Sequence, residues 1–210
     1  AVPMLQKELQ LTLVVASWVI GAYGVLGAVG GLPSGIVASL FSARRTLIAG
    51  LIAAGLGSLA GAMATNGGVL IGTRIIEGCG FLAAVLAVPR LLRAVTAPRD
   101  RDTVLAFWGA YMPAGSVIMM VAGPQLMNFG WQTMWIVNGA VVLLYALIVA
   151  MLPVREETPA QNPGQALLSN VKLAVCAPGP ILLALAFGIY TFQYAALAGL
   201  LPTLLVDRMG

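Results

Sequence analysis

Long apolar stretches separated by short charged segments dominate the chain. Four stretches without a charged residue run for 35, 28, 52 and 34 positions, at 9–43, 46–73, 103–154 and 173–206. A helix that crosses a bilayer needs about 20 residues. The longest stretch therefore predicts two helices, with a break at Asn128-Phe129-Gly130, because Asn and Gly favour turns.

The same pattern predicts six transmembrane helices and an all-α membrane protein. A further turn is expected at Thr65-Asn66-Gly67-Gly68, inside the second stretch. The expected helices lie at 11–37, 46–65, 69–91, 104–127, 132–152 and 178–205.

Composition supports insertion into a lipid bilayer. The chain is 60% hydrophobic and 9% charged, whereas soluble domains carry about 25% charged residues. The net charge of +4 does not predict nucleic-acid binding, because most arginines lie in short loops, where they set membrane orientation. We therefore expect a multi-pass protein of the cell membrane, specifically a bacterial inner membrane.

The loop cations fall mostly on one side of the membrane. The other side receives only Lys7 and Arg208. By the positive-inside rule, the richer side is cytoplasmic. It receives Arg44, Arg45, Arg90, Arg93, Arg99, Arg101, Arg155 and Lys172.

Residue types exclude several kinds of chemistry. The chain contains no histidine, which removes Ser-His and Cys-His catalysis and His-ligated metal sites. Cys79 and Cys176 are isolated, and we expect both to be small buried side chains. We expect no catalytic residue, no metal and no cofactor, and the sequence predicts that the protein is not an enzyme.

Two ionisable residues interrupt the apolar segment 68–89. Arg74 and Glu77 are three positions apart, on one helix face with Gly78 and Phe81. A charge at the centre of a bilayer costs roughly 2.5–3.5 kcal/mol, so such groups usually face a wet cavity or each other. One interpretation is a cavity-facing cation that binds an anionic substrate or couples to protons. The other is a charge pair, or an arginine bound to backbone carbonyls of a neighbouring helix.

Two motifs resemble the major facilitator superfamily. The first is the loop 35–45, in which Gly35, Ala38, Arg44 and Arg45 match the family pattern and Ser39 stands where the family has Asp. In the family this loop latches the two halves together, so the resemblance implies a weaker or different latch. The second motif, Arg-x-x-Gln/Glu-Gly-x-Gly, is matched in full by Arg74, Glu77, Gly78 and Gly80.

The next predicted helix is also similar to its counterpart in the superfamily, rich in Gly and Pro. Its Trp108 is a candidate cavity residue, and lipid-facing bulk is the alternative. Trp131 and Trp135 are expected to be interfacial anchors. The residues that resemble the family's helix-packing positions are Gly78, Gly80, Pro113, Gly115, Gly123 and Pro124.

The resemblance implies a twelve-helix fold of which helices two to seven are present. Residues 1–153 would form an N-terminal half lacking most of its first helix, 154–177 a cytoplasmic linker, and 178–210 the first helix of the C-terminal half. In that last helix, Tyr190, Gln193 and Tyr194 share one face and are candidate substrate contacts, with interhelical polar packing as the alternative.

The function implied is secondary active transport of a small solute by alternating access, with proton coupling, and an anionic solute would suit Arg74. The full-length protein is expected to be a monomer whose partner is its small-molecule substrate. The Trp-Gly-x-x-Met-Pro-x-Gly sequence at 108–115 looks most like the cyanate-permease-like branch. A membrane receptor or assembly subunit that does not transport is the alternative.

Overall fold

The computed structural model describes residues 8–153 and, further on, residues 176–179, 181–182, 185–186, 188–189 and 193. The chain divides into two units, Ala1–Ala160 and Gln161–Gly210. The division falls within the segment 154–177 that was expected to be a linker. The first unit holds the helices described below, and most described residues of the second are helical.

The first three helices of the first unit begin where short polar side chains cap them. Thr12, Ser42 and Asn66 each accept a hydrogen bond from the backbone N–H three residues later. The elements are α2 (Leu13–Leu40), α3 (Ala43–Ala62), α4 (Gly67–Val95), the short 3-10 helix η1 (Pro98–Asp100), α5 (Arg101–Gly109), α6 (Tyr111–Met127) and α7 (Trp131–Met151).

Both turns that the sequence predicted are present. The turn between α3 and α4 contains Thr65 and the capping Asn66. The turn between α6 and α7 ends at Gly130, whose φ of +100° lies in the region that glycine adopts without a steric penalty.

The segment predicted as one helix over 104–127 is instead two helices, so that prediction is wrong in this detail. The break lies at Ala110, between α5 and α6. Pro113 lacks the N–H that would bond to the Gly109 carbonyl in one continuous helix. It is tolerated in the first turn of α6, where the N–H groups have no intrahelical partner.

Four membrane-length units are found among the described residues. They are Ala43–Ala62, Gly67–Val95, Pro98–Met127 and Trp131–Met151, judged by length and hydropathy. α2 is 28 residues long and carries no charged side chain. The sixth predicted helix, 178–205, lies largely outside the described residues.

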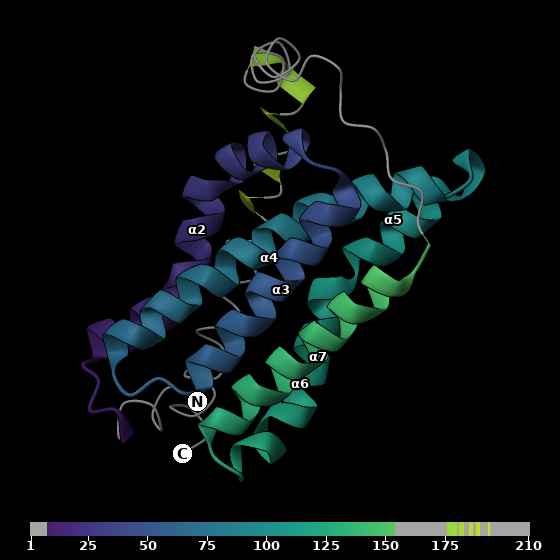
Figure 1. Ribbon diagram of the computed structural model, residues 1–210. Coiled ribbons are helices and arrows are strands. Elements are labelled where there is room, and N and C mark those ends of the chain that lie inside the picture. The colour runs from purple at the N-terminus through teal and green to yellow at the C-terminus, as the bar shows by residue number, and fades with distance from the viewer. Residues whose placement is uncertain are drawn as a thin grey trace, which may run out of the picture. The chain divides into compact units, whose positions relative to one another are not determined.

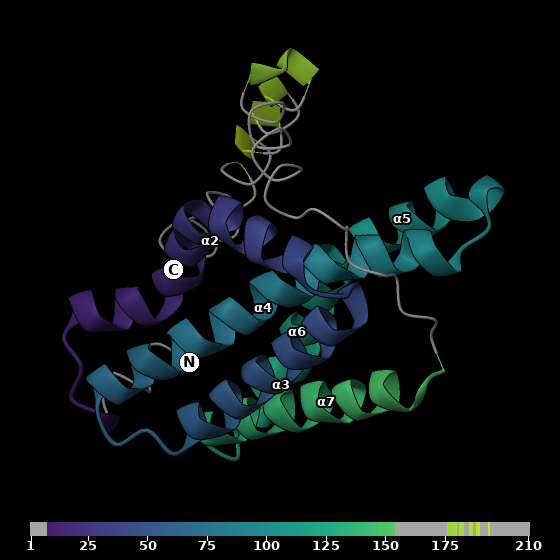
Figure 2. The same ribbon diagram turned by 45° about the horizontal axis from the view of Figure 1, so that its top comes forward.

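α3 is the central helix of the first unit. It packs along α4 on one side and α7 on the other, while α2 packs against α4 (Figures 1 and 2). α5 and α6 make few contacts with the other helices. Close approach of α3 and α4 depends on glycine, because a Cβ at Gly50 would lie 2.7 Å from the Gly80 carbonyl oxygen.

The core consists of two apolar clusters at opposite ends of α3, α4 and α7. The first cluster contains Val19, Ala64, Leu70, Trp131 and Trp135. The second contains Leu47, Leu51, Ala87, Ala146 and Val149. Between the two clusters lie the buried polar residues Ser58 of α3 and Thr73, Arg74 and Glu77 of α4. Buried Ser42 instead caps the start of α3.

Candidate functional site: a charge pair between two apolar clusters

Arg74 and Glu77 of α4 form a buried ion pair. The contact joins Arg74 Nη1 to Glu77 Oε2, and each residue is 6% exposed. The guanidinium carbon of Arg74 lies 5.1 Å from the centre of the Trp135 ring on α7, within the range of a cation–π contact. The pair is therefore enclosed by protein, the second of the two arrangements that the sequence left open. Whether Arg74 also binds a substrate stays a prediction.

Side chains from three other helices meet Glu77. Asn138 Nδ2 of α7 donates to Glu77 Oε1 at 3.3 Å and also to Ser58 Oγ of α3 at 3.2 Å. Ser58 Oγ in turn donates to the Trp135 carbonyl oxygen at 3.0 Å. The Tyr23 hydroxyl of α2 hydrogen-bonds to the Glu77 carboxylate. One carboxylate thus connects α2, α3 and α7 to α4.

Arg74 is less well satisfied than Glu77. Its Nε and Nη2 atoms are buried and have no hydrogen-bond partner among the described residues. Buried polar groups are nearly always paired, and the exceptions require an explanation. Two donors on one guanidinium match the two oxygens of a carboxylate or a similar planar anion.

Small residues on α3 make room for this pair. A Cβ at Gly61 would lie 2.6 Å from Arg74 Nη2, and one at Gly57 would lie 3.0 Å from the Glu77 backbone nitrogen. The glycines therefore let α3 lie directly against the charged face of α4. A larger residue at either position would displace the pair or separate the helices.

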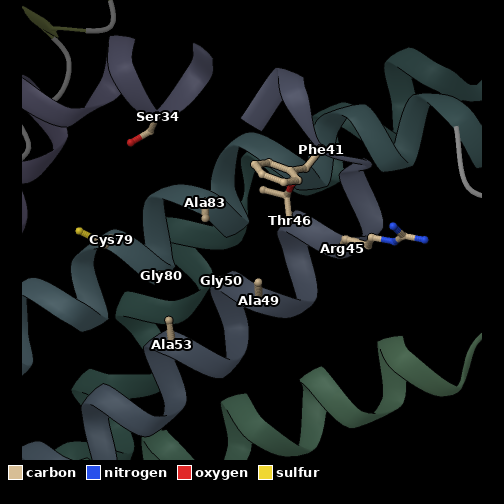
Figure 3. A pocket seen from close by; sticks show the side chains of 10 residues that line it. All are labelled: Ser34, Phe41, Arg45, Thr46, Ala49, Gly50, Ala53, Cys79, Gly80 and Ala83. Atoms are coloured by element: carbon tan, nitrogen blue, oxygen red, sulfur yellow. The ribbon is translucent and has the colours of Figure 1, made fainter. Parts of the chain in front are cut away.

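An apolar pocket of about 540 Å³ lies between α2, α3 and α4. Its walls are mostly small residues of α3 and α4, such as Ala49, Gly50 and Ala83 (Figure 3). Cys79 also lines it and is exposed, so the expectation of a buried Cys79 is wrong. Cys176 is exposed as well.

The arginines of the proposed latch loop lie at one end of the bundle. Arg44 Nη2 donates to the carbonyl oxygens of Ala150 at 2.7 Å and Leu152 at 3.0 Å, at the C-terminal end of α7. A cation at that position stabilises the helix terminus. Arg45 lines the pocket, with its guanidinium pointing away from the small residues (Figure 3).

The remaining predicted residues differ in their surroundings. A Cβ at Gly78 would lie 2.6 Å from Leu26 of α2, so Gly78 and Gly80 both pack closely on neighbouring helices. A Cβ at Gly35, Gly115 or Gly123 would instead meet no atom within 4 Å. Pro113 and Pro124 lie within α6. Tyr190 and Tyr194 are outside the described residues, and Gln193 is helical and exposed in the second unit.

Trp131 and Trp135 were expected to be interfacial anchors, and both are instead buried. Trp131 is 1% exposed, packs edge-on against Trp135, and donates from Nε1 to Glu8 Oε2 at 2.7 Å. Apolar side chains of α2 and α4 cover them, which the sequence around α7 does not reveal.

Sequence reasoning missed Asn138, Ser58 and Tyr23. The sequence feature that could have indicated this network was Asn138, a carboxamide within the apolar run of α7. Polar side chains in such a position usually hydrogen-bond to another helix. Within the part of the chain that the structure describes, no group of three or more His, Cys, Asp and Glu side chains could hold a metal ion.

Comparison with known proteins resolves the family. The profile of the Major Facilitator Superfamily matches residues 1–210. The chain belongs to the Major Facilitator Superfamily. It is therefore a multi-pass membrane protein of a transporter family rather than an enzyme, and the resemblance found in its two motifs is confirmed.

Several relatives of this superfamily member are similar over most of the chain. Puromycin resistance protein pur8 of Streptomyces alboniger is 32% identical over 157 residues, 73% of this chain and 31% of the relative. The 3-(3-hydroxy-phenyl)propionate transporter of Escherichia coli is 28% identical over 193 residues, 91% of this chain and 48% of the relative. The lincomycin resistance protein of Streptomyces lincolnensis is 29% identical over 168 residues, which are 78% of this chain and 34% of the relative. The matched chain thus spans half or less of each relative's length.

Proposed function

We propose that the chain forms the first half, the linker and the next helix of a secondary active transporter for a small organic anion. Transport would proceed by alternating access and be coupled to protons. The observation that carries this proposal is Arg74, the eighth of the 29 residues of the membrane-length helix α4, which is buried with two guanidinium donors that have no partner among the described residues. An ionisable group inside a membrane-spanning helix is expected to serve a transport pathway.

Glu77 is the proposed proton-coupling group. As a carboxylate it pairs with Arg74 and accepts from Asn138 and Tyr23 on two other helices. Protonation would remove the charge that holds Arg74 and weaken the contacts that converge on α4. Arg74 would then be available to a substrate anion, so proton binding and anion binding would favour each other.

The names of the relatives support an organic substrate. One relative is named for 3-(3-hydroxy-phenyl)propionate, and two others are named for resistance to puromycin and lincomycin. Placement in the cyanate-permease-like branch stays a prediction from the sequence 108–115. A carboxylate and cyanate are both anions, so Arg74 suits either.

The experiment uses the complete transporter in liposomes and compares Glu77→Gln with Asp102→Asn. The second variant makes the same carboxylate-to-amide change at an exposed position in the first turn of α5. Uptake of radiolabelled 3-(3-hydroxyphenyl)propionate is measured under an imposed pH gradient and, separately, as exchange without a gradient. Glu77→Gln should abolish gradient-driven accumulation and retain exchange, while Asp102→Asn retains both.

An Arg74→Lys variant tests the anion site in the same assay. Lysine keeps the charge and loses the planar fork of donors, so the concentration of substrate needed for half-maximal exchange should rise about tenfold. Gradient-driven accumulation that is unchanged in Glu77→Gln, or exchange that is unchanged in Arg74→Lys, would contradict the proposal.

A further inference from the structure

Four aromatic side chains form a continuous row across α2, α4, α6 and α5. The ring centres of Tyr23 and Phe81 are 6.0 Å apart, those of Phe81 and Tyr111 are 6.5 Å apart, and those of Tyr111 and Trp108 are 5.4 Å apart. These distances fall within the range of favourable aromatic pairs. The row therefore joins α2 and α4, which pack against each other, to α5 and α6, which make few other contacts.

The row lies at the middle depth of the membrane-spanning helices. Phe81 is the fifteenth of the 29 residues of α4. Trp108 and Tyr111 are the eleventh and fourteenth of the 30-residue span Pro98–Met127, and Tyr23 is the eleventh of the 28 residues of α2. Aromatic residues that anchor a protein in a bilayer gather instead at its two interfaces. Membrane anchoring thus does not explain this row.

The rings are incompletely covered within the part of the chain that the structure describes. Phe81 is 37% exposed and Tyr111 36% exposed, whereas Trp131 and Trp135 in the apolar cluster are buried. The row also reaches the charge pair, because the Tyr23 hydroxyl bonds to Glu77, whose carboxylate contacts Arg74. A half-exposed aromatic surface is thus connected to a buried cation through one tyrosine and one glutamate.

We propose that this aromatic row binds the aromatic ring of the transported solute, which makes the substrate an aromatic carboxylate. The proposal rests on the anion-binding role proposed above for Arg74. The ring lies against Phe81 and Tyr111 while the carboxylate is directed toward the Arg74–Glu77 pair. Substrate sites of secondary transporters lie near the midplane of the bilayer, which is the depth of the row.

The test compares two acids that share a carboxylate and a chain length and differ in the aromaticity of the ring. Binding of 3-phenylpropionate and 3-cyclohexylpropionate to the complete transporter in lipid nanodiscs is measured by isothermal titration calorimetry. The unmodified transporter should prefer the phenyl compound by about 2- to 12-fold, the contribution of one aromatic pair beyond its buried area. Phe81→Leu and Tyr111→Leu should each remove most of that preference.

Phe129→Leu is the matched control, because Phe129 is 82% exposed in the turn between α6 and α7. It should keep the full preference, and thermal unfolding of all three variants shows whether a loss reflects misfolding. If a variant unfolds early, Phe81→Tyr replaces it and should retain the preference.

Equal binding of the two acids, or a preference unaffected by Phe81→Leu and Tyr111→Leu, overturns the inference. If both acids bind equally and Arg74→Lys weakens both, the anion-binding proposal survives. If neither acid binds, both proposals fail.

Discussion

At the scale of single residues, the buried position of Arg74 changes what its removal should do. If Arg74 faced a wet cavity, the first of the two interpretations of the sequence, its removal would affect substrate handling more than folding. The structure encloses the pair at 6% exposure for each residue. Removing one partner of a buried ion pair leaves an uncompensated charge and costs about 3–5 kcal/mol.

We therefore expect Arg74→Ala to lower the thermal stability of the purified protein markedly. Arg74→Ala combined with Glu77→Gln should recover most of the loss, because no lone carboxylate remains. Thermal unfolding of Arg74→Ala, Glu77→Gln and the double variant in one detergent gives the coupling free energy between the two residues. A double variant no more stable than Arg74→Ala alone would show that the pair is not what holds this region together.

At the scale of elements, α3 and α4 touch backbone to backbone where Gly50 and Gly80 meet. A Cβ at Gly80 would lie 2.5 Å from the backbone nitrogen of Ala54, while one at Gly72 on the same helix would meet nothing within 4 Å. Gly80 and Gly72 therefore form a matched pair for testing close packing.

We expect Gly80→Ala to destabilise the bundle by about 1–3 kcal/mol, the usual cost of overpacking a tight contact. Gly72→Ala should be neutral or slightly stabilising, because alanine is the better helix former. Thermal unfolding of both variants in matched lipid distinguishes them. Equal stability of the two would show that α3 and α4 are further apart than described here.

The elements also show what could be predicted from sequence. Helix positions followed from charge spacing, and both turns followed from Asn and Gly, because these signals are local. The break at Ala110 was predictable only from the missing N–H of Pro113. The burial of Trp131 depends on α2 and α4, which are distant from it in sequence.

For the site, Arg74 and Glu77 were found because a charged residue is easily recognised in an apolar helix. Tyr23 and Ser58 were missed because nothing local separates them from ordinary packing residues.

At the scale of the whole molecule, the charged loops should share one side of the membrane. Arg44 contacts the end of α7, and Arg90 Nη2 donates to the Phe41 carbonyl oxygen at 3.4 Å, which brings these helix ends together. Single cysteines at 44 and 99, in a background of Cys79→Ser and Cys176→Ser, should both react with an impermeant thiol reagent only from the cytoplasmic side. Labelling of the two positions from opposite sides would contradict the orientation and the helix count.

We also expect the 210-residue chain alone not to transport. Alternating access requires two repeats that move against each other around a central site, and the chain spans half or less of the relatives reported above. Uptake by liposomes that contain only this chain should equal that of empty liposomes. Saturable uptake above that background would show that these residues suffice for a complete pathway.

The contact of Arg44 with the end of α7 has a consequence for biosynthesis. The arginine and the Ala150 carbonyl are 106 residues apart in sequence. At a synthesis rate of about 5–20 residues per second, the ribosome needs on the order of 5–20 seconds to supply the acceptor. The contact can therefore form only after the last helix of this unit has been synthesised, so a nascent chain that holds α3 and α4 without α7 precedes the complete unit.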